Sequence, residues 1–173
     1  MIELRAFHRI CFALVFILSL ISEYHGALGQ GKLTHIVGAA SVTDGDTIKI
    51  DGVRIRVHGI DAPESQQLCR MPDQTQWPCG RYATEALANL IGTSIVTCLQ
   101  RDRDKYGRVV ATCLVAQTDL GAWMVKNGLA LAYRAYALDY VEEEGVARRS
   151  RAGMWQGKFV YPWKWRRGVR LSS

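Results

Sequence analysis

Residues 33–60 have the pattern of β-strands, and apolar and polar side chains alternate most clearly in residues 52–60. In the sequence GVRIRVHGI, the apolar residues Val53, Ile55 and Val57 alternate with two arginines and a histidine. A strand with this period of two has one apolar face and one charged face. The Asp51-Gly52 pair is a strong signal for a two-residue hairpin turn. The pattern therefore predicts a three-stranded meander with strands at 34–42, 47–50 and 53–60.

The rest of the chain mixes helical and strand patterns. Residues 81–91 place apolar side chains on one face of a helix, and further helices are expected at 120–127 and 140–151. The apolar runs 94–100 and 109–115 flank the polar sequence RDRDKYGR and predict a hairpin. The polar segment 66–78 contains two prolines and predicts a loop. Since no repeat or interdomain linker interrupts this order, the pattern indicates one α+β domain.

The N-terminus has the pattern of an export signal. Residues 1–9 include two arginines, residues 11–21 are almost entirely apolar, and small residues follow at 26, 27 and 29. The apolar run is shorter than the roughly 20 residues of a comfortable membrane span, although an uncleaved N-terminal anchor is the alternative. We therefore expect a signal peptide at 1–29, a folded domain at 30–173, and a periplasmic or secreted protein with no membrane attachment after cleavage.

Export changes how the cysteines are interpreted. Of five cysteines, Cys11 leaves with the signal, and an even set remains at Cys69, Cys79, Cys98 and Cys113. Outside the cytoplasm an even set favours disulfides, and the rival zinc site lacks both a CxxC motif and a nearby histidine. Four cysteines allow three pairings, but the predicted hairpin places Cys98 opposite Cys113, within bridging distance. We predict the bridges Cys98–Cys113 and Cys69–Cys79.

Composition and charge narrow the class of protein. The chain of 173 residues is 49% hydrophobic and 22% charged, which excludes a disordered protein. Its formal net charge of +6 would attract polyanions such as nucleic acid or an anionic membrane surface, or would simply keep the protein soluble. No feature indicates a stable protein partner, so we expect a monomer.

The candidate chemistry lies in VTDGDTIKI and in RIRVHGIDAPE. Asp46 begins the second predicted strand and Asp61 ends the third, so the hairpin should bring them together. Asp44 precedes Asp46 by two positions, and Glu64 follows Asp61 by three. Acids at close range repel one another, and they therefore bind a cation or pair with bases. Each acid taken singly is better explained as an ordinary turn or loop residue.

Two arginines change this picture. Arg56 lies on the polar face of the third predicted strand, and Arg108 follows the sequence DKYG. Arginine presents planar donors that suit phosphate oxygens. Carboxylates, a hard cation such as calcium and two arginines form a set suited to phosphodiester hydrolysis, in which a free carboxylate orients or deprotonates water.

The motifs DGDT, RIRVHGIDAPE and DKYGR, in this order and spacing, resemble the staphylococcal nuclease (thermonuclease) family over roughly residues 36–155. The resemblance implies a five-stranded OB-type β-barrel with about three packed helices, and a calcium-dependent nuclease of DNA and RNA. It implies that Asp46, Asp61 and the backbone carbonyl of Ala62 hold Ca2+, with Asp44 acting mainly through water. Ala62 stands where the best-known family member has threonine, and a backbone ligand tolerates this change.

The same resemblance assigns the catalytic and substrate positions. Glu64 would be the base or water-orienting group, and Arg56 and Arg108 would contact the phosphate. Lys105 and Tyr106 match positions that contact the nucleotide phosphates, and Tyr133 or Tyr136 matches a tyrosine that packs against the nucleotide.

Two other functions are alternatives to a nuclease. OB barrels often bind nucleic acid without cutting it, so a non-catalytic binding module is one alternative. A role in exopolysaccharide (succinoglycan) biosynthesis is the other, because some thermonuclease-like proteins carry that label.

The tail sequence FVYPWKWRRG resembles a nucleic-acid surface, but we expect its tryptophans to pack against the barrel and its basic residues to face solvent.

Overall fold

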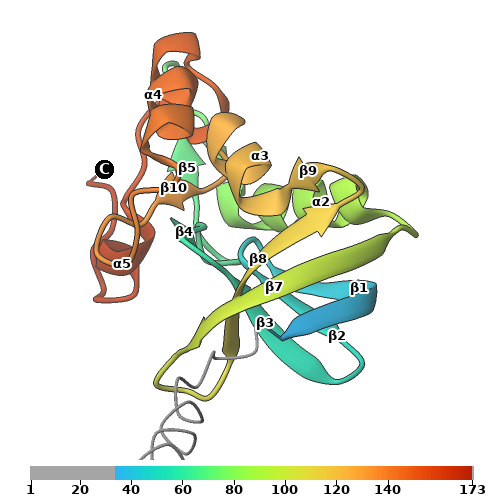
Figure 1. Cartoon of the computed structure of the whole chain (residues 1–173). Coiled ribbons are helices and arrows are strands. Elements are labelled where there is room, and N and C mark those ends of the chain that lie inside the picture. Colours follow the sequence, from blue (N-terminus) through green and yellow to red (C-terminus); the bar gives the residue numbers. More distant parts are fainter. Residues whose placement is uncertain (1–33, 173) are drawn as a thin grey trace, which may run out of the picture. The chain divides into compact units, whose positions relative to one another are not determined.

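A computed structural model describes residues 34–172, and the predicted signal peptide lies outside these residues. Five strands form a closed barrel: β1 (His35–Asp44), β2 (Thr47–Ile50), β3 (Val53–Val57), β7 (Ile95–Arg103) and β8 (Val109–Val115). They follow the order β3-β2-β1-β7-β8, with a short β9 (Thr118–Asp119) beyond β8. A parallel pairing of β3 with β8 closes the barrel. The predicted OB-type barrel is confirmed (Figure 1).

The predicted meander is present, with one correction. Asp51 and Gly52 have φ values of 47° and 83°, as a two-residue turn of type I′ requires, and β2 has the predicted bounds. The third strand does not continue to residue 60, however. It stops at Val57, turns at Gly59 with φ of 71°, and resumes as β4 (Ile60–Asp61). Because β4 pairs with β10 (Leu131–Ala132) and not with the barrel, Asp61 lies on a separate two-stranded sheet.

Helices cover one side of the barrel in Figure 1. The described residues contain the α-helices α2 (Cys79–Ile91), α3 (Leu120–Lys126), α4 (Val141–Ser150) and α5 (Pro162–Trp165), and the 3-10 helix η2 (Gly153–Gln156). The first three correspond to the predicted helices, and α5 adds a single turn in the tail. None of the helices within residues 34–172 is long and apolar enough to cross a membrane.

The main core fills the barrel and the space under α2 and α3. Buried residues such as Ile48, Ile55 and Leu87 form one cluster with Cys98 and Cys113. These two cysteines are directly opposed in the β7–β8 register, and they form a disulfide. The predicted Cys98–Cys113 bridge is therefore confirmed, although a bulge between Gln100 and Asp102 shifts the pairing by one residue on the turn side of the cysteines.

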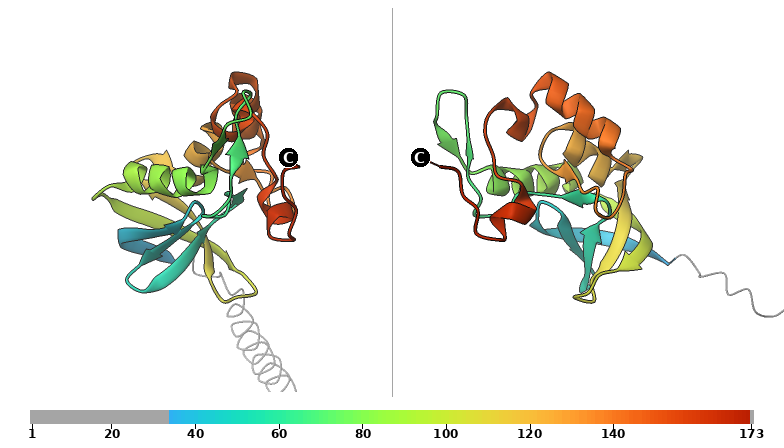
Figure 2. Two further views of the ribbon diagram at one scale, coloured as in Figure 1. Left: turned by 180° about the vertical axis from the view of Figure 1, so that it is seen from behind. Right: turned by 90° about the vertical axis from the view of Figure 1, so that its left-hand side faces the viewer.

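Residues 66–78 form a hairpin, where the sequence predicted a loop. Strands β5 (Cys69–Arg70) and β6 (Gln76–Trp77) pair, and the predicted Cys69–Cys79 disulfide closes them. Arg70 exchanges two backbone hydrogen bonds of 2.8 Å with Lys158, and the Gln67 amide donates to the carbonyl of Val160 at 2.6 Å. The hairpin thus holds the C-terminal segment beside it (Figure 2).

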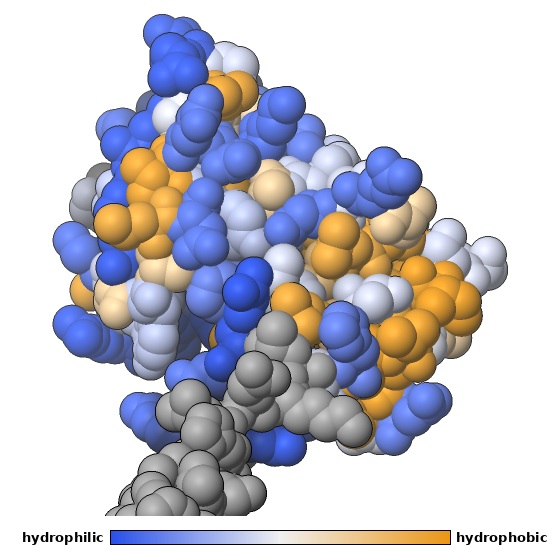
Figure 3. Space-filling model, viewed as in Figure 1, coloured by the Kyte–Doolittle hydropathy of each residue, from blue (hydrophilic) through white to orange (hydrophobic). Residues whose placement is uncertain are grey.

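The surface seen in Figure 3 is largely polar. Apolar residues gather on its right-hand side, over β1 and β7, where the side chains of Val37 and Ile95 are exposed. This patch lies on the barrel wall and includes none of the predicted site residues.

Candidate active site

The turn between β1 and β2 brings Asp46 against the end of β4. The Asp46 backbone N–H donates to Asp44 Oδ1 at 3.1 Å, which holds the turn, and the Ala62 N–H donates to Asp46 Oδ2 at 3.0 Å. A Cβ atom at Gly45 would lie 2.7 Å from the Cβ of Ala62. The glycine of the DGD sequence is therefore required for this close approach, and the approach places Asp46 beside Asp61 as the hairpin pattern predicted.

Arg56 joins the two buried aspartates. Its Nη1 lies 2.8 Å from Asp46 Oδ1, and its Nη2 lies 2.8 Å from Asp61 Oδ1. Burial raises the pKa of Asp46 and of Asp61. Arg56 offsets only part of the rise at Asp46, and Arg166 together with Arg56 offsets only part of it at Asp61. Burial acts to lower the pKa of Arg56, but the two aspartates outweigh it and raise that pKa. Arg56 therefore stays charged beside them.

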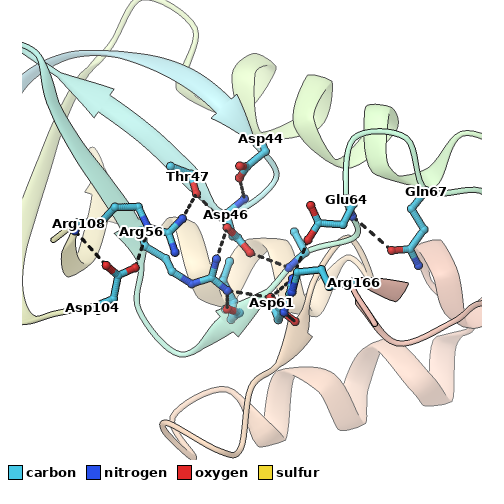
Figure 4. Close-up of polar contacts among 12 residues, drawn as sticks. Asp44, Asp46, Thr47, Arg56, Asp61, Glu64, Gln67, Asp104, Arg108 and Arg166 are labelled. Carbon is cyan, nitrogen blue, oxygen red and sulfur yellow. Dashed lines mark hydrogen bonds and ion pairs between the residues drawn. The ribbon is translucent and has the colours of Figure 1, made fainter. Parts of the chain in front are cut away.

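A third arginine enters the site from the tail (Figure 4). Arg166 donates to Asp61 Oδ2 at 2.7 Å, to Asp61 Oδ1 at 3.1 Å, and to Glu64 Oε1 at 2.7 Å. Its pKa is raised, because Asp61 and Glu64 outweigh the effect of burial. The expectation that the basic residues of the tail face solvent is therefore wrong for Arg166. The acid cluster attracts its charge into the site.

Glu64 lies at the edge of this cluster. Its carboxylate is less than half exposed, at 41% of the side chain, and its backbone N–H donates to the Gln67 side chain at 3.3 Å. Water can therefore reach the side chain, while the backbone of Glu64 is held by Gln67, which precedes the β5–β6 hairpin. A carboxylate in this position can orient a water molecule.

Arg108 is held by a local ion pair. Its Nε lies 2.7 Å from Asp104 Oδ2, and Nη1 approaches the Thr47 hydroxyl at 3.5 Å. Asp104 also accepts the backbone N–H groups of Tyr106 and Arg108. Although burial acts to raise it, the pKa of Asp104 is lowered because these hydrogen bonds favour the ionised carboxylate.

A cavity of about 810 Å3 connects these groups. Asp44, Asp46, Arg56, Glu64 and Arg108 line it, as do Ala62 and Arg166. The four predicted substrate residues Lys105, Tyr106, Tyr133 and Tyr136 line the same cavity. Asp61 is fully buried behind its arginines. The fold therefore gathers the predicted site residues around one opening.

The predicted substrate residues differ in how exposed their side chains are. The side chains of Tyr106 and Tyr136 are 74% and 75% exposed, and Lys105 lies 5.1 Å from the Tyr106 ring. Tyr133 is half-buried, because its ring stacks on Trp163 of the tail at 5.5 Å. Tyr106 and Tyr136 are thus the more accessible to a base, although the Tyr136 ring also lies 5.1 Å from that of Tyr133.

The charges of the inner cluster leave an excess of acid. Four carboxylates (Asp44, Asp46, Asp61 and Glu64) meet two guanidinium groups, those of Arg56 and Arg166. Within residues 34–172, no group of three or more acidic, histidine or cysteine side chains is arranged to hold a metal ion as it stands. Carboxylate and carbonyl oxygens are nevertheless the donors that a hard divalent cation takes. The chemistry of this donor set fits calcium, while both oxygens of Asp61 are engaged by arginine.

Two charged residues that bond the predicted site side chains, Asp104 and Arg166, were not found from the sequence. Asp104 had a local signal, since it stands four positions before Arg108 in the DKYGR turn. Arg166 had none, because 105 positions separate it from Asp61. Only the docking of the tail brings them together.

Comparison with known proteins agrees with this geometry. A family model described as staphylococcal nuclease homologue matches residues 54–157. A micrococcal nuclease of Shigella flexneri is 32% identical over 150 residues, which cover 76% of this chain and 80% of that protein. The succinoglycan biosynthesis protein ExoI of Rhizobium meliloti is 34% identical over 131 residues, covering 74% and 69% of the two chains. An uncharacterised endonuclease of Escherichia coli is 33% identical over 133 residues, covering 72% and 80%. The barrel, the site and these matches together show that the chain belongs to the staphylococcal nuclease family.

Proposed function

We propose that this protein is an exported, calcium-dependent endonuclease that hydrolyses phosphodiester bonds in DNA and RNA. Family membership supports a nuclease acting as a hydrolase, and the calcium dependence, the substrates and the export are the further content of the proposal. The observation that carries it is one cavity lined by Asp46, Glu64, Arg56 and Arg108, with Asp61 buried beneath.

The roles of the side chains follow from their contacts. A calcium ion held by Asp46, Asp61 and the carbonyl of Ala62 would supply positive charge that polarises the phosphate. Glu64, which water can reach, orients or deprotonates the attacking water. Arg108 offsets the negative charge that develops on the phosphate, and Asp104 fixes the orientation of its guanidinium through Nε.

Arg56 has a more constrained role. It is bonded to both aspartates and its side chain is 18% exposed, so it reaches the phosphate only at the wall of the cavity. Its first effect is to keep Asp46 and Asp61 together in spite of their repulsion. Arg56 can also stabilise the transition state, but this requires one of its N–H donors to turn toward the phosphate.

The cavity rim suits a single strand of either nucleic acid. Arg54, Arg101, Arg103 and Lys105 line the cavity and attract the phosphate backbone. Tyr106 and Tyr136 offer exposed rings on which any base can stack. Backbone attraction and stacking do not depend on base identity or on the sugar, and we therefore expect cleavage of both DNA and RNA.

The decisive experiment is hydrolysis of single-stranded DNA and RNA by the purified protein, in calcium and then in excess EGTA. We expect cleavage in calcium alone, and a loss of about 10²–10⁴-fold in Glu64→Gln, the range for a positioned acid or base. Glu85→Gln is the matched control, because Glu85 is exposed on α2 and, within residues 34–172, its one ion pair is with Arg81, at 3.7 Å. Full activity in Glu64→Gln would refute the mechanism, and binding without cleavage would favour a non-catalytic module.

Export is supported by residues 1–29, which lie outside the described residues, and by two disulfides that are typical of proteins outside the cytoplasm. Cell fractionation tests this part, and a cytoplasmic pool that retains residues 1–29 would contradict it.

A second candidate function is a role in exopolysaccharide production. Its support is the name of the Rhizobium meliloti relative. The site residues do not favour a glycosidase, which needs two positioned carboxylates and has no need of these arginines. A deletion strain with altered polymer, together with a protein inert toward nucleic acid, would favour this second function.

A further inference from the structure

The guanidinium of Arg166 engages the two carboxylates that the proposed reaction needs free. Its donors bond both oxygens of Asp61, at 3.1 and 2.7 Å, and Oε1 of Glu64 at 2.7 Å. A calcium ligand must offer an oxygen to the ion, and a base must offer one to water. In the described arrangement Arg166 therefore competes for the groups on which the proposed function depends.

The tail that carries Arg166 is firmly docked. Gln67 bonds the carbonyl of Val160, and Trp163 stacks on Tyr161 at 4.8 Å and on Tyr133 at 5.5 Å. The Arg166 side chain itself is 40% exposed. Rotation of that side chain into solvent therefore releases Asp61 and Glu64 without undocking the tail.

Arg166 is easier to displace than Arg56, although both bond Asp61. The side chain of Arg56 is 18% exposed and also bonds Asp46, so its removal would leave the buried Asp46 without its arginine. Arg166 approaches from the open side of the cluster and shares its charge with the partly exposed Glu64. An entering cation therefore replaces Arg166 and leaves Arg56 in place.

We propose that Arg166 is an internal counter-ion that competes with the divalent cation for Asp61 and Glu64, and so sets the cation affinity of the site. This inference rests on the calcium dependence proposed above. In the absence of the cation, Arg166 closes the site by occupying Asp61 and Glu64. Its release, coupled to cation entry, makes both carboxylates available.

The test is isothermal titration calorimetry with CaCl2 alone, without nucleic acid, on the full chain and its variants. We expect Arg166→Gln to lower the Kd for calcium about tenfold, within the 5–150-fold range typical of coupled binding. Arg167→Gln is the matched control, since Arg167 is the next residue, is exposed, and loses the same charge. Its Kd should equal that of the unaltered protein. Arg166→Lys should lie between, because lysine keeps the charge without the planar fork.

The outcomes separate this inference from the proposed function. Equal calcium affinity in Arg166→Gln and the unaltered protein would overturn the competition and leave calcium dependence standing. A weaker affinity in Arg166→Gln would also overturn it, because Arg166 would then support the cation. If neither protein binds calcium, the proposed calcium dependence and this inference fail together. Should Arg166→Gln not fold, a lower Kd for Arg166→Lys is the expected result and an unchanged Kd the contrary one.

Discussion

Asp61 and Glu144 are two buried carboxylates with nearly the same immediate surroundings. Their side chains are 0% and 1% exposed. Arg56 and Arg166 hold Asp61, and two other arginines, Arg134 and Arg148, hold Glu144 at 2.8 and 3.0 Å. The two carboxylates are linked through one small sheet, since Asp61 belongs to β4 and Glu144 accepts the N–H of Ala132 in β10 at 3.2 Å.

Asp61 and Glu144 differ in the balance of charge around them and in whether a cavity lies beside them. Asp61 shares its arginines with Asp46 and Glu64, which leaves acid in excess beside a cavity. Glu144 has two arginines to itself, and these are 45% and 47% exposed. A buried carboxylate paired with arginine is therefore no evidence of a site in itself. An excess of acid at an opening is the feature that indicates cation chemistry.

The largest expected effect on stability is at Glu144. Glu144→Ala should lower the free energy of unfolding by about 3 kcal/mol, because it leaves the Ala132 N–H without its acceptor and opens a cavity in the packing. This is the low end of the usual cost of breaking a buried pair, since both arginines can turn to solvent. Urea denaturation measures the loss, and calcium titration of the same variant should give an unchanged Kd. A weakened calcium affinity would abolish the contrast between the two clusters.

Asp61→Asn should give the opposite result. We expect the calcium Kd to rise by more than about 100-fold, beyond the 10–100-fold typical of losing an outer-shell partner. The loss of stability should be smaller than for Glu144→Ala, because removing one charge relieves the repulsion with Asp46. Calorimetry and urea denaturation on both variants test whether Asp61→Asn weakens calcium binding more and Glu144→Ala lowers the stability more. The comparison fails if Asp61→Asn binds calcium normally.

The smallest effect concerns Asp104 and Arg108, a one-to-one pair at the cavity wall. The pKa of Asp104 is lowered in the folded protein, so its contribution to stability is present above the pKa of the unfolded chain and is lost as the pH falls through the folded value. Asp104→Asn should therefore lower the thermal midpoint at pH 7 by a few degrees. The difference from the unaltered protein should shrink below about pH 4, near the ordinary pKa of aspartate. A difference that does not change with pH would assign the effect to the turn alone.

Much of the barrel and part of the site could be predicted from local sequence. The strand patterns give β2 and β8 with their observed bounds, and the Asp51-Gly52 turn sets the register that brings Asp46 toward the segment of Asp61. The DKYG turn similarly sets the hairpin in which Cys98 faces Cys113. These features depend on turns and on side-chain alternation, which act over a few residues.

Other features depend on contacts that no local pattern encodes. The break at Gly59 moves Asp61 from the barrel to β4, because β10 offers a partner from far along the chain. The β5–β6 hairpin forms where a loop was expected, since the Cys69–Cys79 bridge closes it and the tail pairs with it.

The sequence by itself determined the barrel, the disulfides and the neighbourhood of Asp46 and Asp61. The tertiary structure alone decided that Arg166 joins Arg56 at these acids. Arg166 reaches Asp61 only because a second hydrophobic cluster, built from Cys69, Cys79 and the aromatic residues of the tail, docks the C-terminal segment. The entropy of closing a loop of more than 100 residues is offset by that packing and by the attraction of surplus acid for a guanidinium. Neither contribution can be evaluated from the sequence, because both depend on which surfaces are in contact in the folded protein.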